Sequence, residues 1–291
     1  MILEPRRVPL GGLRAINVWR TLPYRDLPTI GAWCFVDHFG PTDERMTVLP
    51  HPHIGLQTVT WPIAGDVEHR DSLGNVQVLR PAELNLMTAG DGISHSEFSV
   101  GQGDMHGIQL WVALPDSVRA SPPSFEHLAD LPRVGEANWD AIVLVGELAG
   151  ERSKATVHSP LVSAEIALKA GASEIPLDPT FEHGIIAVTG AIRVDGAPLG
   201  HRHLQFMPPG ETSVTLEADE PTLAFLIGGA PFDEPLVMWW NFVARDHDEI
   251  VAARDDWEAQ RPRFGRVDGH DGTWIPAPPL PPLHLKPRVR R

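Results

Sequence analysis

Glycine and proline punctuate this chain so densely that long helices cannot form over most of its length. The 291 residues include 26 glycines and 29 prolines, and both residue types destabilise helix interiors. Between them lie short apolar runs rich in Val, Ile, Leu and Trp, bounded by Gly, Pro, Asp or Asn, a pattern typical of strands and turns. A helical bundle is therefore excluded, and the sequence predicts an all-β protein.

The predicted strands form two similar sets. The apolar runs lie at 32–37, 54–63, 66–69, 76–79, 83–88 and 107–114 in the first half, and at 141–145, 162–168, 184–188, 191–194, 204–207, 213–216 and 223–227 in the second. Similar numbers of runs at similar spacing indicate one architecture built twice. The chain length fits two domains of roughly 140 residues or one large β domain.

Shifts in composition set the predicted domain boundaries. Residues 115–140 carry several prolines among Ser, Ala and Asp with little periodicity, which is typical of a linker. We therefore expect an N-terminal barrel over 1–114 and a C-terminal barrel over 141–275.

Two segments near the end of the chain depart from the strand pattern. A helix is expected near 246–260, because Asp246 and Glu249 form a plausible capping pair and three apolar side chains fall on one face, namely Ile250, Ala253 and Trp257. Residues 276–291 contain six prolines and end in basic residues, namely Lys286, Arg288, Arg290 and Arg291. This segment is expected to be an extended tail, either strapped over the surface or disordered.

Two segments of the first half carry metal-ligand spacing. His51 and His53 alternate in PHPHIG, and alternate side chains of an extended segment point to the same face. His95 and Glu97 repeat this spacing in GISHSE. If the two strands face each other inside a barrel, three nitrogens and one carboxylate oxygen converge. Such a set suits Fe(II), Mn(II), Ni(II), Cu(II) or Zn(II) and leaves coordination positions open to substrate or dioxygen.

Chance pairing is the alternative, since the chain contains 14 histidines. Two ligand pairs in one predicted barrel, embedded in glycine-rich turns, favour a metal site. The other histidines are expected to be structural. His38, His69 and His106 would lie in the barrel wall, and the less favoured alternative for them is support of a metal ligand or a hydrogen bond across the pocket. The second H-x-H, at His201 and His203, has no His or Glu following at the spacing of the first.

Longer stretches around these residues resemble the pirin family of bicupin proteins. The resemblance rests on VDHFGP at 36–41, on PHPHIGLQTVTW and MTAGDGISHSE within 50–97, and on HGIQLWV at 106–112. In the second half, FEHGIIAVTGAIRVDG and GGAPFDEP resemble the family's C-terminal cupin. The resemblance extends from about Gly11 to Phe264. It implies two tandem jelly-roll-like cupin barrels, to which the residue pattern adds a short C-terminal helix.

The resemblance also implies where the chemistry lies. A metal would be held in the N-terminal cupin by His51, His53, His95 and Glu97, whereas the C-terminal cupin has lost its site. One divalent transition metal is expected, Fe(II) first, with Mn, Ni, Cu and Zn as alternatives.

Two functions follow from this resemblance. Some family members cleave the flavonol quercetin with dioxygen, so the leading hypothesis is a mononuclear metal-dependent dioxygenase that takes a small aromatic, flavonol-like substrate. Glu97 would then be both ligand and general base for the substrate hydroxyl. A eukaryotic member is an iron-dependent partner of transcription factors. The alternative is therefore a metal-gated binding or redox-sensing protein that regulates a protein partner.

Charge and cysteine usage limit the partners and the compartment. The formal net charge of −14 opposes electrostatic binding to the phosphates of nucleic acid. Cys34, the only cysteine, cannot form an intrachain disulfide, and the N-terminus lacks a long apolar segment with a cleavage site. We therefore expect a cytoplasmic protein. No apolar run is long enough to span a bilayer, so no membrane partner is expected.

Overall fold

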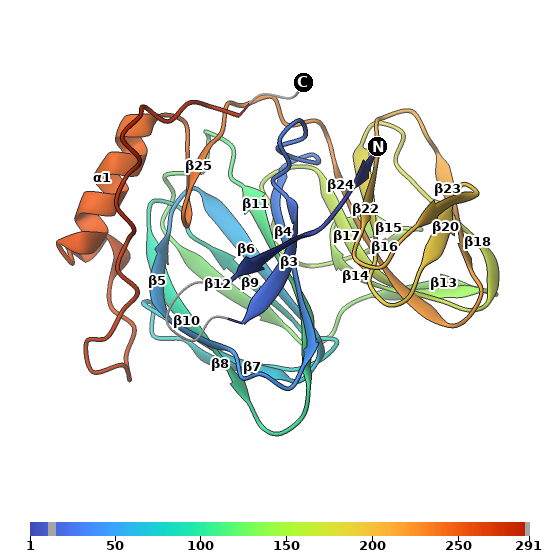
Figure 1. Ribbon diagram of the computed structural model, residues 1–291, viewed down its shortest axis with the longest axis horizontal. Coiled ribbons are helices and arrows are strands. Elements are labelled where there is room, and N and C mark those ends of the chain that lie inside the picture. The colour runs from blue at the N-terminus through green and yellow to red at the C-terminus, as the bar shows by residue number, and fades with distance from the viewer. Residues whose placement is uncertain (11–15, 289–291) are drawn as a thin grey trace. The chain divides into compact units, whose positions relative to one another are not determined.

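Strands dominate the chain. The computed structural model describes residues 1–10 and 16–288, and within them one α-helix occurs, α1 (His247–Glu258), with a 3₁₀ turn, η1 (Pro262–Phe264) (Figure 1). No helix in this part of the chain is long and apolar enough to cross a membrane. The all-β fold with a short C-terminal helix is thereby confirmed. Gly11, where the family resemblance begins, and Arg290 and Arg291 of the tail lie outside the described residues.

Contacts divide the chain into two compact units, each assembled from three segments. Unit 1 comprises Met1–Arg6, Trp19–Val36 and Leu128–Phe232, and unit 2 comprises Arg7–Val18, Asp37–His127 and Asp233–Arg291. Helix α1 therefore belongs to unit 2, although the predicted boundaries put it with the C-terminal barrel. Contact units are not the same as independently folding domains, so the boundaries at 114 and 141 stay a prediction.

Unit 2 contains a four-stranded sheet and most of a seven-stranded sheet. The smaller sheet has the order β5 (Thr47–His53), β10 (Ile93–Val100), β7 (Asp66–Asp71) and β8 (Val76–Leu79). The larger has the order β12 (Ser124–Leu128), β9 (Leu84–Thr88), β6 (Leu56–Ala64), β11 (Met105–Ala113), β4 (Trp33–Thr42), β3 (Asn17–Leu22) and β2 (Arg6–Pro9). Side chains from both sheets form one core cluster that includes Val18, Phe39, Val48, Val67 and Met105. The sheets thus pack face to face, as in a cupin barrel.

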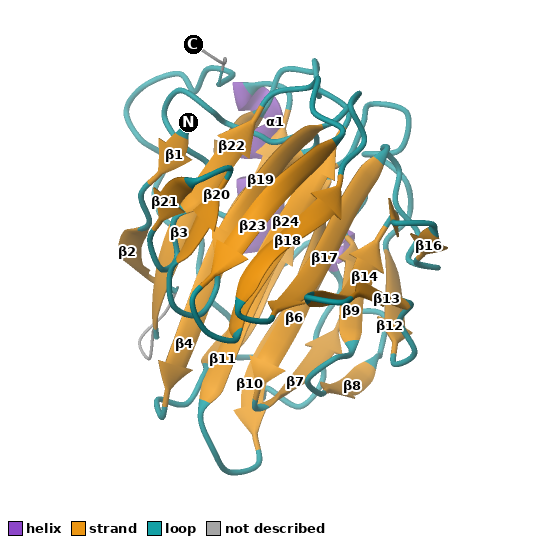
Figure 2. Ribbon diagram, turned by 90° about the vertical axis from the view of Figure 1, so that its right-hand side faces the viewer, coloured by secondary structure: helices purple, strands orange, loops and turns teal. Residues whose placement is uncertain are grey.

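Unit 1 repeats this plan. Its larger sheet has the order β1 (Ile2–Leu3), β22 (Leu204–Met207), β19 (Glu182–Ala187), β24 (Thr222–Gly229), β17 (Leu161–Leu168), β14 (Trp139–Val145) and β13 (Arg133–Glu136). Its smaller sheet has the order β18 (Gly171–Pro176), β23 (Ser213–Ala218), β20 (Ile192–Val194) and β21 (Ala197–Leu199), and a separate hairpin pairs β15 (Glu147–Leu148) with β16 (Glu151–Arg152) (Figure 2). The predicted duplication of one architecture is thus seen in the sheet orders.

The segment 115–140 has more regular structure than its composition predicts. It contains β12 and β13, each of which is the edge strand of a seven-stranded sheet. Neither strand buries a residue fully. Because an edge strand can be held by backbone pairing alone, it needs no apolar periodicity, and the sequence pattern therefore gave no strand signal here.

Helix α1 begins where the capping pair predicts. The side chain of Asp246 accepts a hydrogen bond from the backbone N–H of Glu249 at 3.0 Å. The buried face packs against aromatic side chains of β26 (Phe242–Ala244) and η1, and β26 pairs with β25 (Val237–Trp239). The residues of this face are the three predicted ones, Ile250, Ala253 and Trp257.

The tail crosses this helical region as a strap over its described part, 276–288. The N–H of Ala277 donates to a carboxylate oxygen of Glu258 at 2.7 Å, and the N–H of Leu285 donates to Nδ1 of His247 at 3.2 Å. Of the two forms expected for the tail, the strapped one is therefore observed here.

Candidate metal centre

The four predicted ligands lie on two neighbouring strands. β5 carries His51 and His53, and β10 carries His95 and Glu97. The strands pair antiparallel with His95 opposite His51, and the register shifts between His95 and Glu97. The sequence spacing therefore brings both pairs to one place in unit 2.

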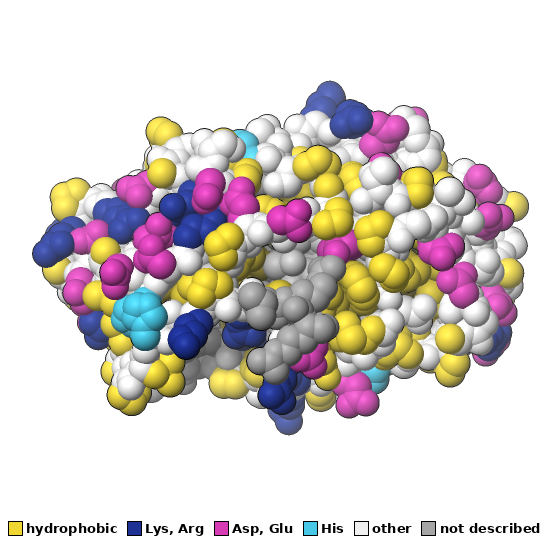
Figure 3. Space-filling model, turned by 90° about the horizontal axis from the view of Figure 1, so that it is seen from above, with side chains coloured by type: hydrophobic (Ala, Val, Ile, Leu, Met, Phe, Trp, Pro, Cys, Tyr) yellow, Lys and Arg dark blue, Asp and Glu magenta, His cyan; other side chains and the backbone are white. Residues whose placement is uncertain are grey.

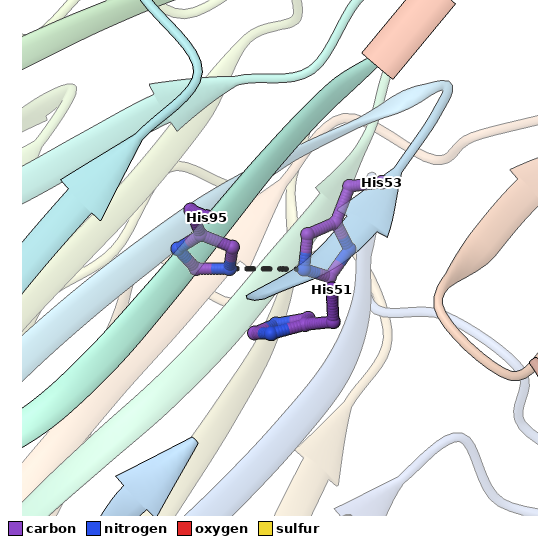
Figure 4. Close-up of side chains that lie close together, drawn as sticks. All are labelled: His51, His53 and His95. Carbon is purple, nitrogen blue, oxygen red and sulfur yellow. Dashed lines mark hydrogen bonds between the residues drawn. The ribbon is translucent and has the colours of Figure 1, made fainter. Parts of the chain in front are cut away.

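Three of these residues form a tight cluster. Nε2 of His53 lies 3.1 Å from Nε2 of His95, and the ring centroids of His51 and His95 are 4.4 Å apart (Figure 4). The side chains are 7%, 1% and 1% exposed in the order His51, His53 and His95. One nitrogen from each lies within 4.8 Å of the other two, which is the spacing of a metal-binding group.

Backbone carbonyls orient two of the rings. Nδ1 of His51 lies 2.9 Å from the carbonyl oxygen of Leu49, and Nδ1 of His53 lies 3.0 Å from that of Asn241. A carbonyl oxygen can only accept, so Nδ1 is the protonated nitrogen in both rings. Each neutral ring therefore turns an Nε2 lone pair toward the cluster.

A carboxylate orients the third ring through another histidine. Nδ1 of His95 lies 3.3 Å from Nδ1 of His69, and Nε2 of His69 lies 3.1 Å from Oδ2 of Asp71. Asp71 accepts from Nε2 of His69, so Nδ1 of His69 is free to accept from Nδ1 of His95. This leaves the Nε2 lone pair of His95 facing that of His53.

Burial keeps the cluster uncharged. It lowers the pKa of His51 to about 4, and it lowers the pKa of His53 and His95 well below the ordinary value, with nearby histidines adding to the effect. All three rings are therefore neutral near pH 7, which is the form that binds metal ions.

Glu97 is placed differently from the other three predicted ligands. It groups with His69 and His95, whose ligand atoms lie within 4.8 Å of its carboxylate, and not with His51 and His53. Burial raises its pKa above the ordinary value, against opposing effects of His69 and a hydrogen bond from Thr60. That bond runs from Oγ1 of Thr60 to Oε1 at 3.1 Å. Glu97 thus adjoins the histidine cluster through His95.

Two models of known families match the chain. The model described as Pirin matches residues 15–112, and the model described as Pirin C-terminal cupin domain matches residues 163–265. The chain belongs to the pirin family.

Individual relatives are similar to this chain over nearly its whole length. A Pseudomonas aeruginosa protein named "putative quercetin 2,3-dioxygenase" is 43% identical over 282 residues, covering 95% of this chain and 89% of the relative. A Caulobacter vibrioides pirin-like protein is 36% identical, with 96% and 99% covered. A crystal structure titled quercetin 2,3-dioxygenase from Acinetobacter baumannii superposes with a TM-score of 0.94 at 40% identity, with 99% and 98% covered. The predicted bicupin fold is confirmed.

His69 is a site residue for which sequence reasoning favoured the barrel wall and kept contact with a metal ligand as the alternative. It lies on β7, which pairs with the opposite edge of β10, so that His69 faces Glu97 and Asp71 faces His95. Its ring also stacks on Phe125 at 4.4 Å between centroids. The spacing of His69 and Asp71, again i and i+2 on a strand, was the available signal.

The other predicted structural residues keep apart from this cluster. His38 and His106 are buried and stacked on each other, with their Nε2 atoms 2.7 Å apart. In the second H-x-H, His201 and His203 each contact a backbone carbonyl oxygen. Cys34, outside this group, is buried.

Proposed function

We propose that this pirin is a mononuclear metal-dependent dioxygenase that acts on a flavonol-like, quercetin-type substrate. The observation that carries the proposal is the convergence of three buried, neutral imidazoles, each with its Nδ1 engaged and its Nε2 turned toward the others. The names of relatives at 43% and 40% identity support the substrate class.

His51, His53, His95 and Glu97 would hold one divalent transition ion, with Fe(II) favoured over Mn, Ni, Cu and Zn. The donor set fits such an ion, because two lone pairs facing each other at 3.1 Å repel unless a cation or proton lies between them. Two nitrogens held at right angles, each about 2.1 Å from an ion, lie about 3.0 Å apart. When bound, the ion supplies Lewis-acid polarisation of a substrate oxygen and electron transfer to dioxygen.

Glu97 would accept the proton of the substrate hydroxyl. Burial raises the pKa of its carboxyl, which brings its basicity closer to neutral pH, where a general base works best. The hydrogen bond from Thr60 fixes one carboxylate oxygen, Oε1, and leaves Oε2 for the ion or the substrate.

The test compares oxygen consumption per bound metal for wild type and Glu97→Gln, with quercetin as substrate. The amide keeps an oxygen that can approach the ion but loses charge and basicity, so metal content should fall modestly. Turnover per metal should fall by about a hundredfold to ten-thousandfold, the usual contribution of general-base assistance. Glu136→Gln, an exposed carboxylate of unit 1, is the matched control and should retain full turnover.

Equal turnover per metal in wild type and Glu97→Gln would remove Glu97 as the base. No turnover by the wild type with quercetin or any other flavonol would favour the second candidate, a metal-gated binding or redox-sensing protein that acts on a protein partner. That partner and the cytoplasmic location stay predictions.

A further inference from the structure

Unit 1 contains a cavity of about 700 Å³, within the size range of small-molecule sites. Its inner walls come from β17, β19 and β24, the strands grouped in Figure 2. Apolar side chains on these walls include Val162 and Leu226, and the segment between β18 and β19 adds Leu177 and Phe181. Such walls select an apolar body in whatever molecule enters.

The lining also carries polar side chains, and among these His183 is the buried one. It lies on β19 two residues before Ile185, which belongs to the core of this unit, so its ring also points to the inside of the barrel. It is 1% exposed. Opposite it on β24 stands Gly228, where a Cβ atom would lie 2.6 Å from Cδ2 of the ring. The absence of a side chain at Gly228 is therefore what makes room for the imidazole.

The imidazole of His183 has a buried nitrogen that is available for a hydrogen bond to a ligand. Its Nε2 is buried and has no hydrogen-bond partner. Buried polar atoms are nearly always satisfied, since leaving one unpaired costs free energy. Burial also lowers the pKa of His183 to about 4, although Asp178 opposes the shift, so the ring is neutral near pH 7.

Metal ions do not fit this arrangement. Both metal-binding groups found among residues 1–10 and 16–288 lie in unit 2. A single histidine offers too few ligands for a protein metal site. An organic ligand is therefore the better partner for His183.

The charges near the cavity mouth select a neutral ligand. Glu147 and Arg152 line the cavity and pair with each other at 2.7 Å, and Asp178 adds a carboxylate whose Oδ1 accepts hydrogen bonds from the N–H and Oγ1 of Thr180. A carboxylate ligand would meet this negative charge, whereas an uncharged hydroxyl would not. A hydroxyl both donates and accepts, so it can satisfy Nε2 of His183 in either tautomer.

We propose that this cavity is a second binding site of the pirin, specific for a neutral aromatic alcohol whose ring packs on the apolar walls and whose hydroxyl bonds His183. Its binding requires neither the metal centre nor the proposed dioxygenase activity.

The probe is 2-naphthol, titrated into the full-length protein and followed by nuclear Overhauser effects from its ring to the methyl groups of Val162 and Leu226. Two analogues isolate the hydroxyl: naphthalene lacks it, and 2-naphthoate replaces it with a charge. We expect 2-naphthol to bind and 2-naphthoate to bind at least about tenfold more weakly.

The key variant is His183→Leu, which removes the polar atom and retains the apolar volume. It should lower the affinity for 2-naphthol by about three- to tenfold, the usual contribution of one hydrogen bond. The affinity for naphthalene should stay unchanged or rise. His203→Leu, the same substitution at a partly exposed position of unit 1, should change neither. His51→Ala, which disrupts the candidate metal centre, should also leave 2-naphthol binding unchanged, so this proposal and the dioxygenase proposal can fail separately.

Two results would overturn the proposal. One is the absence of Overhauser effects to Val162 and Leu226 in the wild type, a measurement that does not depend on any variant folding. The other is equal 2-naphthol affinity in a folded His183→Leu and in His203→Leu.

Discussion

At the scale of single residues, the hydrogen bonds behind the ligands decide how well the candidate centre can bind an ion. Asp71 holds His69, and His69 holds His95. Burial alone would raise the pKa of Asp71, but hydrogen bonds from His69 and Asn75 outweigh burial and lower it. Asp71 is therefore a stable carboxylate that fixes the tautomer of a ligand two side chains away.

Replacing the carboxylate of Asp71 should weaken metal binding. We expect Asp71→Asn to lower metal affinity by about ten- to a hundredfold, as is usual for partners of ligating histidines. Competition with a chromogenic chelator measures it. The matched control is Glu68→Gln on the same strand, whose carboxylate pairs with Arg70 instead, and which should bind as wild type. Unchanged affinity in Asp71→Asn would mean that His95 is oriented without this chain of contacts.

The buried histidines also predict how the metal-free protein responds to acid. In the unfolded chain, histidine side chains become protonated below about pH 6.5. In the folded protein, His51 stays unprotonated until about pH 4, because burial lowers its pKa. The free energy of unfolding should therefore fall as pH drops from about 6.5 toward 4, by about 1.4 kcal/mol per pH unit for each such histidine. Denaturant unfolding of metal-free protein across this range measures the slope. His51→Gln should make it shallower, and an identical slope would contradict the prediction.

Site residues whose positions follow from local spacing could be predicted. Site residues whose positions follow from the pairing of distant strands could not. His51 and His53 share a face because a strand alternates, which the sequence displays directly. The grouping of Glu97 with His69 depends on β7 pairing with β10, 24 or more residues away, and no local pattern encodes that pairing. The free Nε2 of His183 likewise depends on Gly228 lying opposite it.

At the scale of elements, the turn that follows the H-x-H requires glycine at position 55. Gly55 leads from β5 toward β6 with φ +67°, and its N–H donates to the carbonyl of Gly90 at 2.9 Å. A Cβ at this position would lie 2.1 Å from the carbonyl oxygen of Val243. Only glycine fits both the left-handed backbone and the close approach.

Gly55→Ala should therefore destabilise the fold by more than about 3 kcal/mol, since it adds a backbone clash to backbone strain. Gly101→Ala is the matched control: its φ is +73°, and nothing lies within 4 Å of the added Cβ. It should cost only the strain, about 1–2 kcal/mol. Chemical denaturation of both variants gives the comparison. Equal losses would mean that the contact with Val243 relaxes freely.

Strands with buried apolar runs were predictable, and strands that bury no side chain were not. The runs at 66–69 and 76–79 became β7 and β8, and the run at 107–114 became most of β11. β2, β12 and β13 have no fully buried residue and are held by neighbouring backbones, so their sequences lack the apolar signal.

At the scale of the whole molecule, charge is distributed without a basic surface on the face shown in Figure 3. Basic and acidic side chains are interspersed there, most densely at the end that carries α1. Ion pairs between the two kinds of side chain occur in the described part of the chain, where Arg119 and Arg263 each contact acidic side chains at about 3 Å. With a net charge of −14, this supports the prediction that the protein does not bind nucleic acid directly.

The division into two units could not be predicted from the sequence, because it too depends on strand pairing between distant residues. Composition marks linkers, but compact units follow from which strands pair. β1 joins unit 1 because Ile2 pairs with Gln205, which lies 203 residues later in the chain. Similarly, residues 233–291 join unit 2, where Phe242 and Phe264 pack around Ile54.

This arrangement predicts the behaviour of the fragment 1–114. The fragment contains all four proposed ligands but lacks Asn241, whose carbonyl oxygen accepts from His53, and Phe264, whose carbonyl accepts from Ser94. It also exposes the apolar side chains that residues 233–291 cover, so we expect a poorly soluble protein with strongly reduced metal affinity. A chain ending at 275 is the matched control, because it retains both carbonyls and should still bind metal. Gel filtration and metal analysis of the two proteins give the answer: a monomeric 1–114 fragment with full metal affinity would show that the strand pair β5 and β10 builds the centre without the C-terminal segment.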